Sequence, residues 1–260
     1  MKTRILSGLI MAPLLVVLYF GGYVLLAACF IIAAVGVYEF LKGFHAIDIH
    51  PSYPIAFASA VLLYSLNLFT DNEHSHTVWL FVSVLASLLY LFKIDERKLE
   101  DAMATIVGIV YVVFFSYHVL LVEQTGDTSI LIWLIVLSAF GTDIFAYFTG
   151  MAIGKHKLCP KISPKKSIEG SIGGTLGSII LCGLFGYFFA EEYLIHCLVI
   201  GLLGGIVSQF GDLTASVFKR KMGIKDYGNL IPGHGGVLDR FDSVLFTAPL
   251  VYYYIVLVIG

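Results

Sequence analysis

Three aspartates in an apolar chain are the residues whose types and spacing point most directly to chemistry. Asp212, Ser216 and Lys219 are spaced i, i+4 and i+7, so a helix carries all three on one face. Asp239 and Asp242 are spaced i and i+3 and project together if a helix begins near them. Converging carboxylates repel one another, and Mg²⁺ relieves this while it binds substrate phosphate oxygens. The pattern predicts a metal site of Asp212, Asp239 and Asp242; salt bridges with neighbouring basic side chains are the alternative.

The segment that joins these aspartates is rich in charge and glycine. Residues 216–242 contain five basic and three acidic residues. They also contain His234, Gly235 and Gly236. Glycines let the backbone approach a phosphate closely and offer N–H donors. A glycine-rich turn alone is more often only a turn, but beside these charges it predicts a nucleotide-phosphate site.

Two further features are candidates for the same site. Asp143 falls in the middle of an apolar run, where a carboxylate costs about 2.5–3.5 kcal/mol to insert into a membrane. It therefore needs a partner, which is either the site or a hydroxyl or amide of a neighbouring helix. Lys165 and Lys166 are adjacent ammonium groups suited to capture a phosphate. Ordinary topogenic charge or contact with anionic lipid is the alternative for this pair.

The elements that must position these residues are membrane helices. The chain is 58% hydrophobic and 13% charged, whereas soluble domains have about 25% charged residues. An all-α, polytopic integral membrane protein is the fold class that this composition predicts. Breaks of charge, glycine and proline mark about nine spans: 5–20, 23–41, 54–69, 77–93, 102–122, 129–152, 171–190, 193–215 and 243–260.

The distribution of charge predicts the orientation of these spans. If the N-terminus lies inside, all 16 Lys and Arg residues fall in inside segments, and the charged side chains of the outside loops are all acidic. This partition follows the positive-inside rule, so we expect a cytoplasmic N-terminus. The two long loops, 153–170 and 216–242, are then both cytoplasmic. Residues 1–100 form N-terminal membrane helices in this interpretation, and 101–260 form a catalytic membrane region.

The residues of these loops resemble the phosphatidate cytidylyltransferase (CDP-diacylglycerol synthase) family. The family pattern extends over 27 residues and is met at every spacing by Ser216, Lys219, Arg220, Lys225, Asp226, Gly228, Ile231, Pro232, His234, Gly235, Gly236, Asp239, Arg240 and Asp242. Upstream agreement includes Asp143, Tyr147, Gly150, Ser163, Pro164, Lys165, Lys166, Glu169 and Gly170. Ser167 stands where the family more often has Thr. The first 100 residues match only in being hydrophobic.

The resemblance implies a multi-helix enzyme that needs Mg²⁺, forms a homodimer and transfers a cytidylyl group from CTP to phosphatidic acid. The products are CDP-diacylglycerol, for phospholipid synthesis, and pyrophosphate. The catalytic residues that it implies are Asp212, Lys219, Arg220, Lys225, Asp226, Asp239, Arg240 and Asp242. The substrate-binding residues that it implies are Asp143, Lys165, Lys166, Ser216, His234, Gly235 and Gly236. We expect a bacterial cytoplasmic membrane, a site that faces the cytoplasm, and no nucleic-acid partner.

Two other functions compete with this one. An ion or solute transporter would place Asp143 and Asp212 on a permeation path, but the chain shows no repeated halves and concentrates its charge in one loop. Another Mg²⁺-dependent lipid phosphotransferase, such as one that joins a CDP-lipid to an alcohol, uses a denser ladder of aspartates than this chain has.

The predicted orientation can be tested by cysteine labelling in a background without the four native cysteines. Glu192→Cys and Lys165→Cys should react with an impermeant maleimide from opposite sides of sealed membranes. Labelling of both positions from the same side would rule out the nine-span arrangement.

Overall fold

The protein is built almost entirely from apolar helices. The computed structural model describes residues 15–70, 72, 74–230 and 235–260. Within this part of the chain, seven helical segments are long and apolar enough to cross a membrane: Gly22–Ile47, Ser75–Phe92, Leu99–Glu123, Gly126–Ile153, Ile168–Phe189, Glu191–Lys221 and Leu238–Ile259. The predicted all-α, polytopic membrane fold is confirmed, and the chain is an integral membrane protein.

The predicted span count is met in part by the described residues. Besides the seven long segments there is a shorter apolar helix, α3, Tyr53–Phe69. Of the first predicted span, residues 5–14 lie outside the described residues, and residues 15–20 are helical. Nine spans and a cytoplasmic N-terminus therefore stay predictions.

Contacts divide the chain into two compact units. Unit 1 comprises Met1–Tyr117 and Lys221–Arg240, and unit 2 comprises His118–Arg220 and Phe241–Gly260. The described part of residues 221–240 therefore packs with the N-terminal helices. The expected division into regions 1–100 and 101–260 concerns their roles and stays a prediction.

Unit 1 contains the packed helices α2 to α5, and the π-helical turn η3 connects α5 to α6. Its elements are α2 Gly22–Phe44, η1 His45–Ile47, α3 Tyr53–Phe69, α4 Ser75–Leu89, η2 Tyr90–Phe92, α5 Leu99–Gly108 and η3 Ile109–Phe114, followed by the start of α6 Phe115–Glu123. Trp79 anchors the packing of α4 on α3, since it is fully buried and its Nε1 donates to the Ser59 carbonyl at 2.8 Å.

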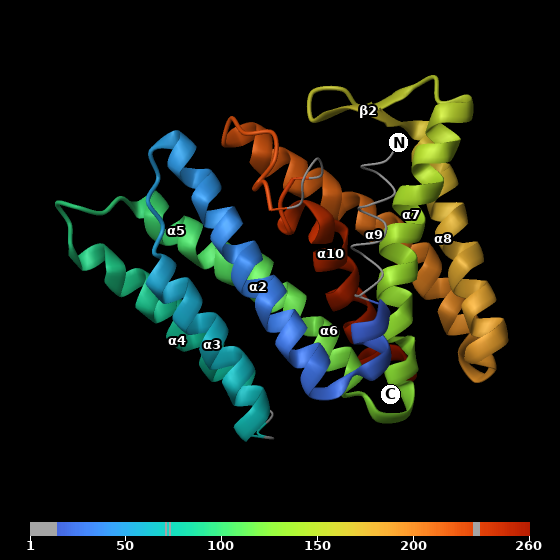
Figure 1. The fold of residues 1–260 in the computed structure, drawn as a ribbon, viewed down its shortest axis with the longest axis horizontal. Coiled ribbons are helices and arrows are strands. Elements are labelled where there is room, and N and C mark those ends of the chain that lie inside the picture. The colour runs from blue at the N-terminus through green and yellow to red at the C-terminus, as the bar shows by residue number, and fades with distance from the viewer. Residues whose placement is uncertain (1–14, 71, 73, 231–234) are drawn as a thin grey trace. The chain divides into compact units, whose positions relative to one another are not determined.

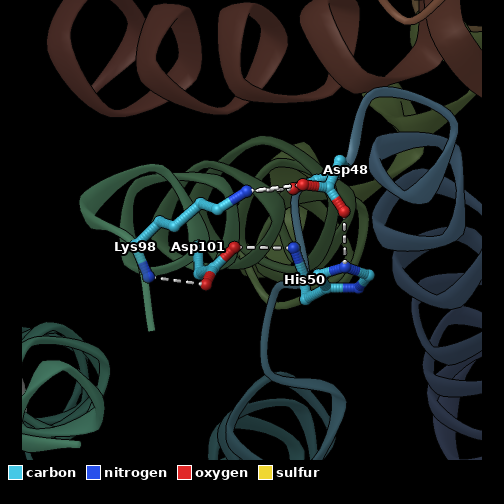
Figure 2. A network of polar contacts seen from close by, with 4 residues as sticks. All are labelled: Asp48, His50, Lys98 and Asp101. Carbon is cyan, nitrogen blue, oxygen red and sulfur yellow. Dashed lines mark hydrogen bonds and ion pairs between the residues drawn. The ribbon is translucent and has the colours of Figure 1, made fainter. Parts of the chain in front are cut away.

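A polar network joins the segment after η1 to the start of α5 (Figure 2). Asp101 is buried, and its carboxylate accepts from the backbone N–H of His50 at 2.6 Å and of Lys98 at 2.9 Å. The Lys98 ammonium binds Asp48 at 2.6 Å and holds the pKa of that carboxyl below its usual value. Asp101 thus satisfies the N–H of Lys98, the N-cap of α5, and one N–H of the segment after η1.

Unit 2 contains α7 and α8, which pack along each other and lie side by side in Figure 1. Its elements are η4 Gly126–Leu131, α7 Ile132–Ile153, β1 Lys157–Cys159, β2 Ser163–Ser167, α8 Ile168–Phe189, η5 Glu191–Tyr193, α9 Leu194–Lys221, α10 Leu238–Tyr254 and η6 Ile255–Ile259; α10 begins in unit 1. Strands β1 and β2 pair antiparallel as a short hairpin.

Glycines let α8 approach α7 closely. A Cβ atom built on Gly170 would lie 2.8 Å from the Ala146 carbonyl oxygen, and one on Gly174 would lie 2.8 Å from the Thr142 carbonyl oxygen. Small residues at such crossings are typical of membrane helices. The α8 helix begins where the Ser167 hydroxyl accepts from the Gly170 N–H at 3.1 Å, which is an N-cap.

Helices extend into the two segments that the sequence predicts as long loops, whose place relative to the membrane stays a prediction. Helix α9 continues to Lys221 and α10 begins at Leu238, so the connection between them is only 222–237. Basic residues end α9 because cations are stabilised near the negative end of a helix dipole. In the other loop, 153–170, backbone pairing forms the hairpin, and α8 begins at Ile168.

Replacing Gly174 with Val should weaken the α7–α8 contact, because the added methyl groups meet the Thr142 carbonyl and Ala146 Cβ. We expect a loss of about 1–3 kcal/mol in unfolding free energy, measured by SDS titration in mixed micelles. Leu176→Val, at an exposed position of the same helix, is the control for the helix propensity of valine. Equal losses in both variants would contradict close packing at Gly174.

Candidate active site

Three of the predicted carboxylates come from three different helices of unit 2. Asp143 lies on α7, Asp212 on α9 and Asp242 on α10. Asp242 is buried, and Asp212, Asp143 and Lys219 are the charged groups that act on it most strongly. Ser243 connects two of them: its N–H donates to Asp242 Oδ1 at 2.8 Å, and its hydroxyl to Asp143 Oδ2 at 3.4 Å. The fold therefore gathers carboxylates that are far apart in the sequence.

Asp212 is held by a lysine from the hairpin. Lys166, on β2, places Nζ 2.5 Å from Asp212 Oδ2, and both side chains are about one-quarter exposed (25% and 26%). On the other side, the Ser216 hydroxyl donates to Asp212 Oδ1 at 3.4 Å. Asp212 and Ser216 are thus neighbours on one helix face, as their spacing predicts. Lys165 is exposed beside Lys166.

A cavity of about 390 Å³ opens next to this ion pair. Its polar lining includes both lysines and two of the carboxylates, whereas α7 contributes an apolar wall. The lining residues are Asp143, Ala146, Tyr147, Gly150, Met151, Leu158, Lys165, Lys166, Ser167, Gly170, Ser171, Gln209 and Asp212. All belong to unit 2. This lining offers ammonium groups to a phosphate and apolar surface to a hydrocarbon chain.

Gln209 lines this cavity although the sequence did not single it out. Its Nε2 donates to the Gly205 carbonyl at 2.8 Å on α9. On α8 it reaches the Thr175 hydroxyl at 3.1 Å and the Ser171 carbonyl at 3.2 Å. It ties α9 to α8 at the cavity wall. Its position three residues before Asp212 in an apolar helix is the signal that could have found it.

The side chains of Lys219 and Arg220, near the end of α9, lie in different surroundings. Lys219 is buried and is one of the groups that act on Asp242. Arg220 is exposed, and its Nε donates to the Ile162 carbonyl in the hairpin at 3.3 Å. Of the two, Lys219 is the cation that the structure places with the carboxylates.

Asp239 organises the glycine-rich segment within unit 1. It is buried at the start of α10, and its Oδ2 accepts from the N–H of Tyr227 at 2.8 Å and of Gly236 at 3.0 Å. Gly235 has φ +85°, and a Cβ there would lie 2.8 Å from Asp239 Oδ2. This position requires glycine because of its backbone conformation as well as its crowding.

The remaining predicted residues of this segment are Lys225, Asp226, His234, Gly235, Gly236 and Arg240. Lys225 and Asp226 are exposed. Arg240 is half-buried, and its Nε has no hydrogen-bond partner among the described residues. His234 lies outside the described residues. The Gly236 N–H donates to Asp239. Phosphate binding at Gly235 and Gly236 therefore stays a prediction, and it would depend on close approach of the phosphate to the backbone.

Glu39 is a second residue that the sequence did not single out. It lies on α2, is 2% exposed, and accepts from the N–H groups of Val237 at 3.1 Å and Leu238 at 2.9 Å. The sequence feature that could have identified Glu39 is a carboxylate near the end of an apolar run.

The predicted metal site can be compared with the donors present. Across residues 15–70, 72, 74–230 and 235–260, no three His, Cys, Asp or Glu side chains are grouped closely enough to hold a metal ion by themselves. Asp212 and Asp242 nevertheless offer hard oxygen donors that act on each other. One or two carboxylates with substrate phosphates are what Mg²⁺ usually takes, so the donor set fits. Asp239, in unit 1, stays a predicted ligand.

Comparison with known proteins agrees with this chemistry. The cytidylyltransferase family model matches residues 2–258. A phosphatidate cytidylyltransferase of Synechocystis sp. is 32% identical, with 98% of this chain and 97% of that protein covered. The phosphatidate cytidylyltransferase of Thermotoga maritima is 30% identical, with 97% and 95% covered. Since the match extends over nearly the whole chain, this protein belongs to the cytidylyltransferase family.

Proposed function

We propose that this protein transfers a cytidylyl group from CTP to phosphatidic acid, giving CDP-diacylglycerol and pyrophosphate. The observation that carries the proposal is the unit 2 cavity, which combines lysines and carboxylates with an apolar wall. Family membership and the names of the full-length relatives support it. A transporter and a different lipid phosphotransferase are not favoured, because the family and these relatives are cytidylyltransferases.

The cavity suits a lipid phosphate. Lys165 and Lys166 supply positive charge at one end, and phosphate is a good partner for an ammonium group. Tyr147 and Met151 line the cavity and are largely exposed on a membrane-spanning helix (53% and 66%). They offer apolar surface to acyl chains that enter from the bilayer. Phosphatidic acid has both the charged head and the tails that this arrangement would recognise.

The ion pair between Lys166 and Asp212 suggests how the two substrates are coupled. A lipid phosphate that binds Lys166 competes with the Asp212 carboxylate at 2.5 Å. Displaced from the lysine, Asp212 becomes available for a cation that accompanies the CTP phosphates. Asp242 would share that role, together with Asp239 as the sequence predicts. Bound Mg²⁺ would neutralise phosphate charge at the reaction centre.

The reaction needs positioning and charge neutralisation more than a base. A phosphate monoester has a second pKa of about 6, so phosphatidic acid is largely a dianion at neutral pH. One of its phosphate oxygens attacks the α-phosphorus of CTP, and the bond to the pyrophosphate leaving group breaks. Lys219, buried with the carboxylates, would stabilise the charge that spreads over the phosphoryl oxygens. Arg220, Lys225 and Arg240 would hold the remaining phosphate charge.

We also propose a homodimer in a bacterial cytoplasmic membrane, with the site facing the cytoplasm. The bacterial relatives support the membrane, and the one-sided distribution of basic residues supports the facing. The homodimer is supported by the family resemblance, and light scattering of purified protein in detergent measures it.

The activity can be tested with radiolabelled CTP, phosphatidic acid and purified protein, with and without chelator. Asp242→Asn should lower kcat about 10²-fold or more, because a preorganised charged group at the reaction centre is lost. Asp127→Asn, at an exposed position of the same unit, should leave the rate unchanged. If Asp242→Asn keeps the wild-type rate over a Mg²⁺ titration, the assigned role is wrong.

Lys166→Ala should raise the KM for phosphatidic acid more than the KM for CTP. A charge-assisted hydrogen bond contributes about 1.5–3 kcal/mol, which corresponds to about 10- to 100-fold in affinity. Lys157→Ala, an exposed lysine of the same hairpin, is the matched control. A larger rise in the KM for CTP would place Lys166 at the nucleotide, and an equal rise in both KM values would contradict its assignment to the lipid.

A further inference from the structure

One face of α2 holds the glycine-rich segment of unit 1. A Cβ on Gly36 would lie 3.7 Å from a Leu238 methyl, and one on Gly43 would lie 2.7 Å from Met222 Sδ. Between them, the Phe40 ring centroid is 5.9 Å from that of Tyr227. These positions are spaced i, i+4 and i+7, so they share one helix face. Helix α2 therefore contacts both ends and the middle of residues 222–238.

Glu39 is the polar group on this part of α2. Its two carboxylate oxygens accept separately from Val237 and Leu238, at 3.1 and 2.9 Å. These are N–H groups at the start of α10, where a helix has no internal partner for them. A carboxylate is also stabilised near this positive end of the helix dipole. Glu39 thus caps the start of α10.

The same carboxylate explains two glycines of the family pattern. Cβ atoms built on Gly228 and Gly236 would both press against the Glu39 carboxylate, and the Gly228 Cβ would lie 2.8 Å from Glu39 Cδ. Any side chain at either position would displace Glu39 or the loop. The two glycines accommodate the carboxylate, and the loop closes around it.

Asp239 holds the same loop through a different pair of N–H groups. Its carboxylate accepts from the N–H groups of Tyr227 and Gly236, the residues that directly precede Gly228 and Val237. Asp239 is in the first turn of α10, and Asp242 is three residues further along the same helix. A change at the start of α10 therefore changes the direction of both carboxylates.

We propose that Glu39 is a positioning residue for the cytidylyl transfer. It sets the start of α10 and the backbone of residues 227–228 and 236–238, and through them the orientation of Asp239 and Asp242. The inference depends on the proposed function for its effect on rate. It assigns a role to the N-terminal helices, which the sequence pattern of the loops does not reach.

The first test is Glu39→Gln, which keeps the size of the side chain but leaves one acceptor oxygen where two are used. We expect kcat to fall about 10- to 100-fold, as is typical when a group that orients reactive ligands is lost. The KM for phosphatidic acid should stay within about twofold of wild type, since Glu39 is not among the residues that line its cavity. An unchanged kcat would overturn the proposal.

Asp101→Asn is the matched control for stability. Asp101 is also a buried carboxylate of unit 1 that accepts from two backbone N–H groups, at the start of α5 (Figure 2). Both variants should lower Tm by similar amounts, but only Glu39→Gln should lower the kcat of the folded protein. Equal losses of kcat in the two variants would mean that Glu39 has a structural role alone.

A double-mutant cycle tests the contact itself. Gly228→Ala should lower kcat in the wild-type background, because its Cβ meets the Glu39 carboxylate. In the Glu39→Ala background the space is open, so the same substitution should have little further effect. Additive losses would contradict the contact.

Amide hydrogen exchange separates this inference from the proposed function. Glu39→Gln should speed exchange at Val237 and Leu238, a result that requires no catalytic activity. If wild-type protein forms no CDP-diacylglycerol but exchange responds as expected, the proposed function fails and the positioning stands. If product forms and exchange is unchanged, the positioning fails.

Discussion

The structure depends on the need to satisfy carboxylates that lie within apolar helices. A charged group at membrane depth is costly unless it has a partner. In unit 2 the partners are side chains, with Lys166 on Asp212 and Ser243 on Asp143. In unit 1 they are backbone N–H groups, bound by Glu39 and Asp239. Because most of these partners come from other parts of the chain, satisfying the carboxylates also assembles the site.

The glycines of the chain follow from the same constraint in two ways. Gly228 and Gly236 leave room for the Glu39 carboxylate, so the loop can donate its N–H groups from close range. Gly170 and Gly174 instead let α8 approach the backbone of α7. That contact brings the hairpin lysines to the cavity next to Asp143 and Asp212. In both units, the absence of a side chain permits a polar contact that a larger residue would block.

The partners of these groups also relate to the chemistry. An ammonium bound to a carboxylate can exchange it for a phosphate, because both are anions with similar hydrogen-bond geometry. The carboxylates of Glu39 and Asp239 instead bind backbone N–H groups of the loop and of the start of α10, so they hold the local backbone conformation. The unit 2 carboxylates are thus suited to respond to substrates, whereas Glu39 and Asp239 are suited to hold a fixed conformation. Nucleotidyl transfer needs both, since it depends on charge neutralisation and on fixed positions.

The sequence by itself determined the fold class, the approximate spans and the family, because hydropathy and the pattern from Ser216 to Asp242 are local properties of the chain. The spacing of Asp212 and Ser216 likewise predicted a shared helix face, which the structure confirms. Only the tertiary structure decided the ends of α9 and α10, the pairing of Lys166 with Asp212, and the role of Glu39. The physical reason is that partners far away in the chain satisfy these groups. Glu39 binds N–H groups 198 and 199 residues further along the chain, a relation that no local pattern contains.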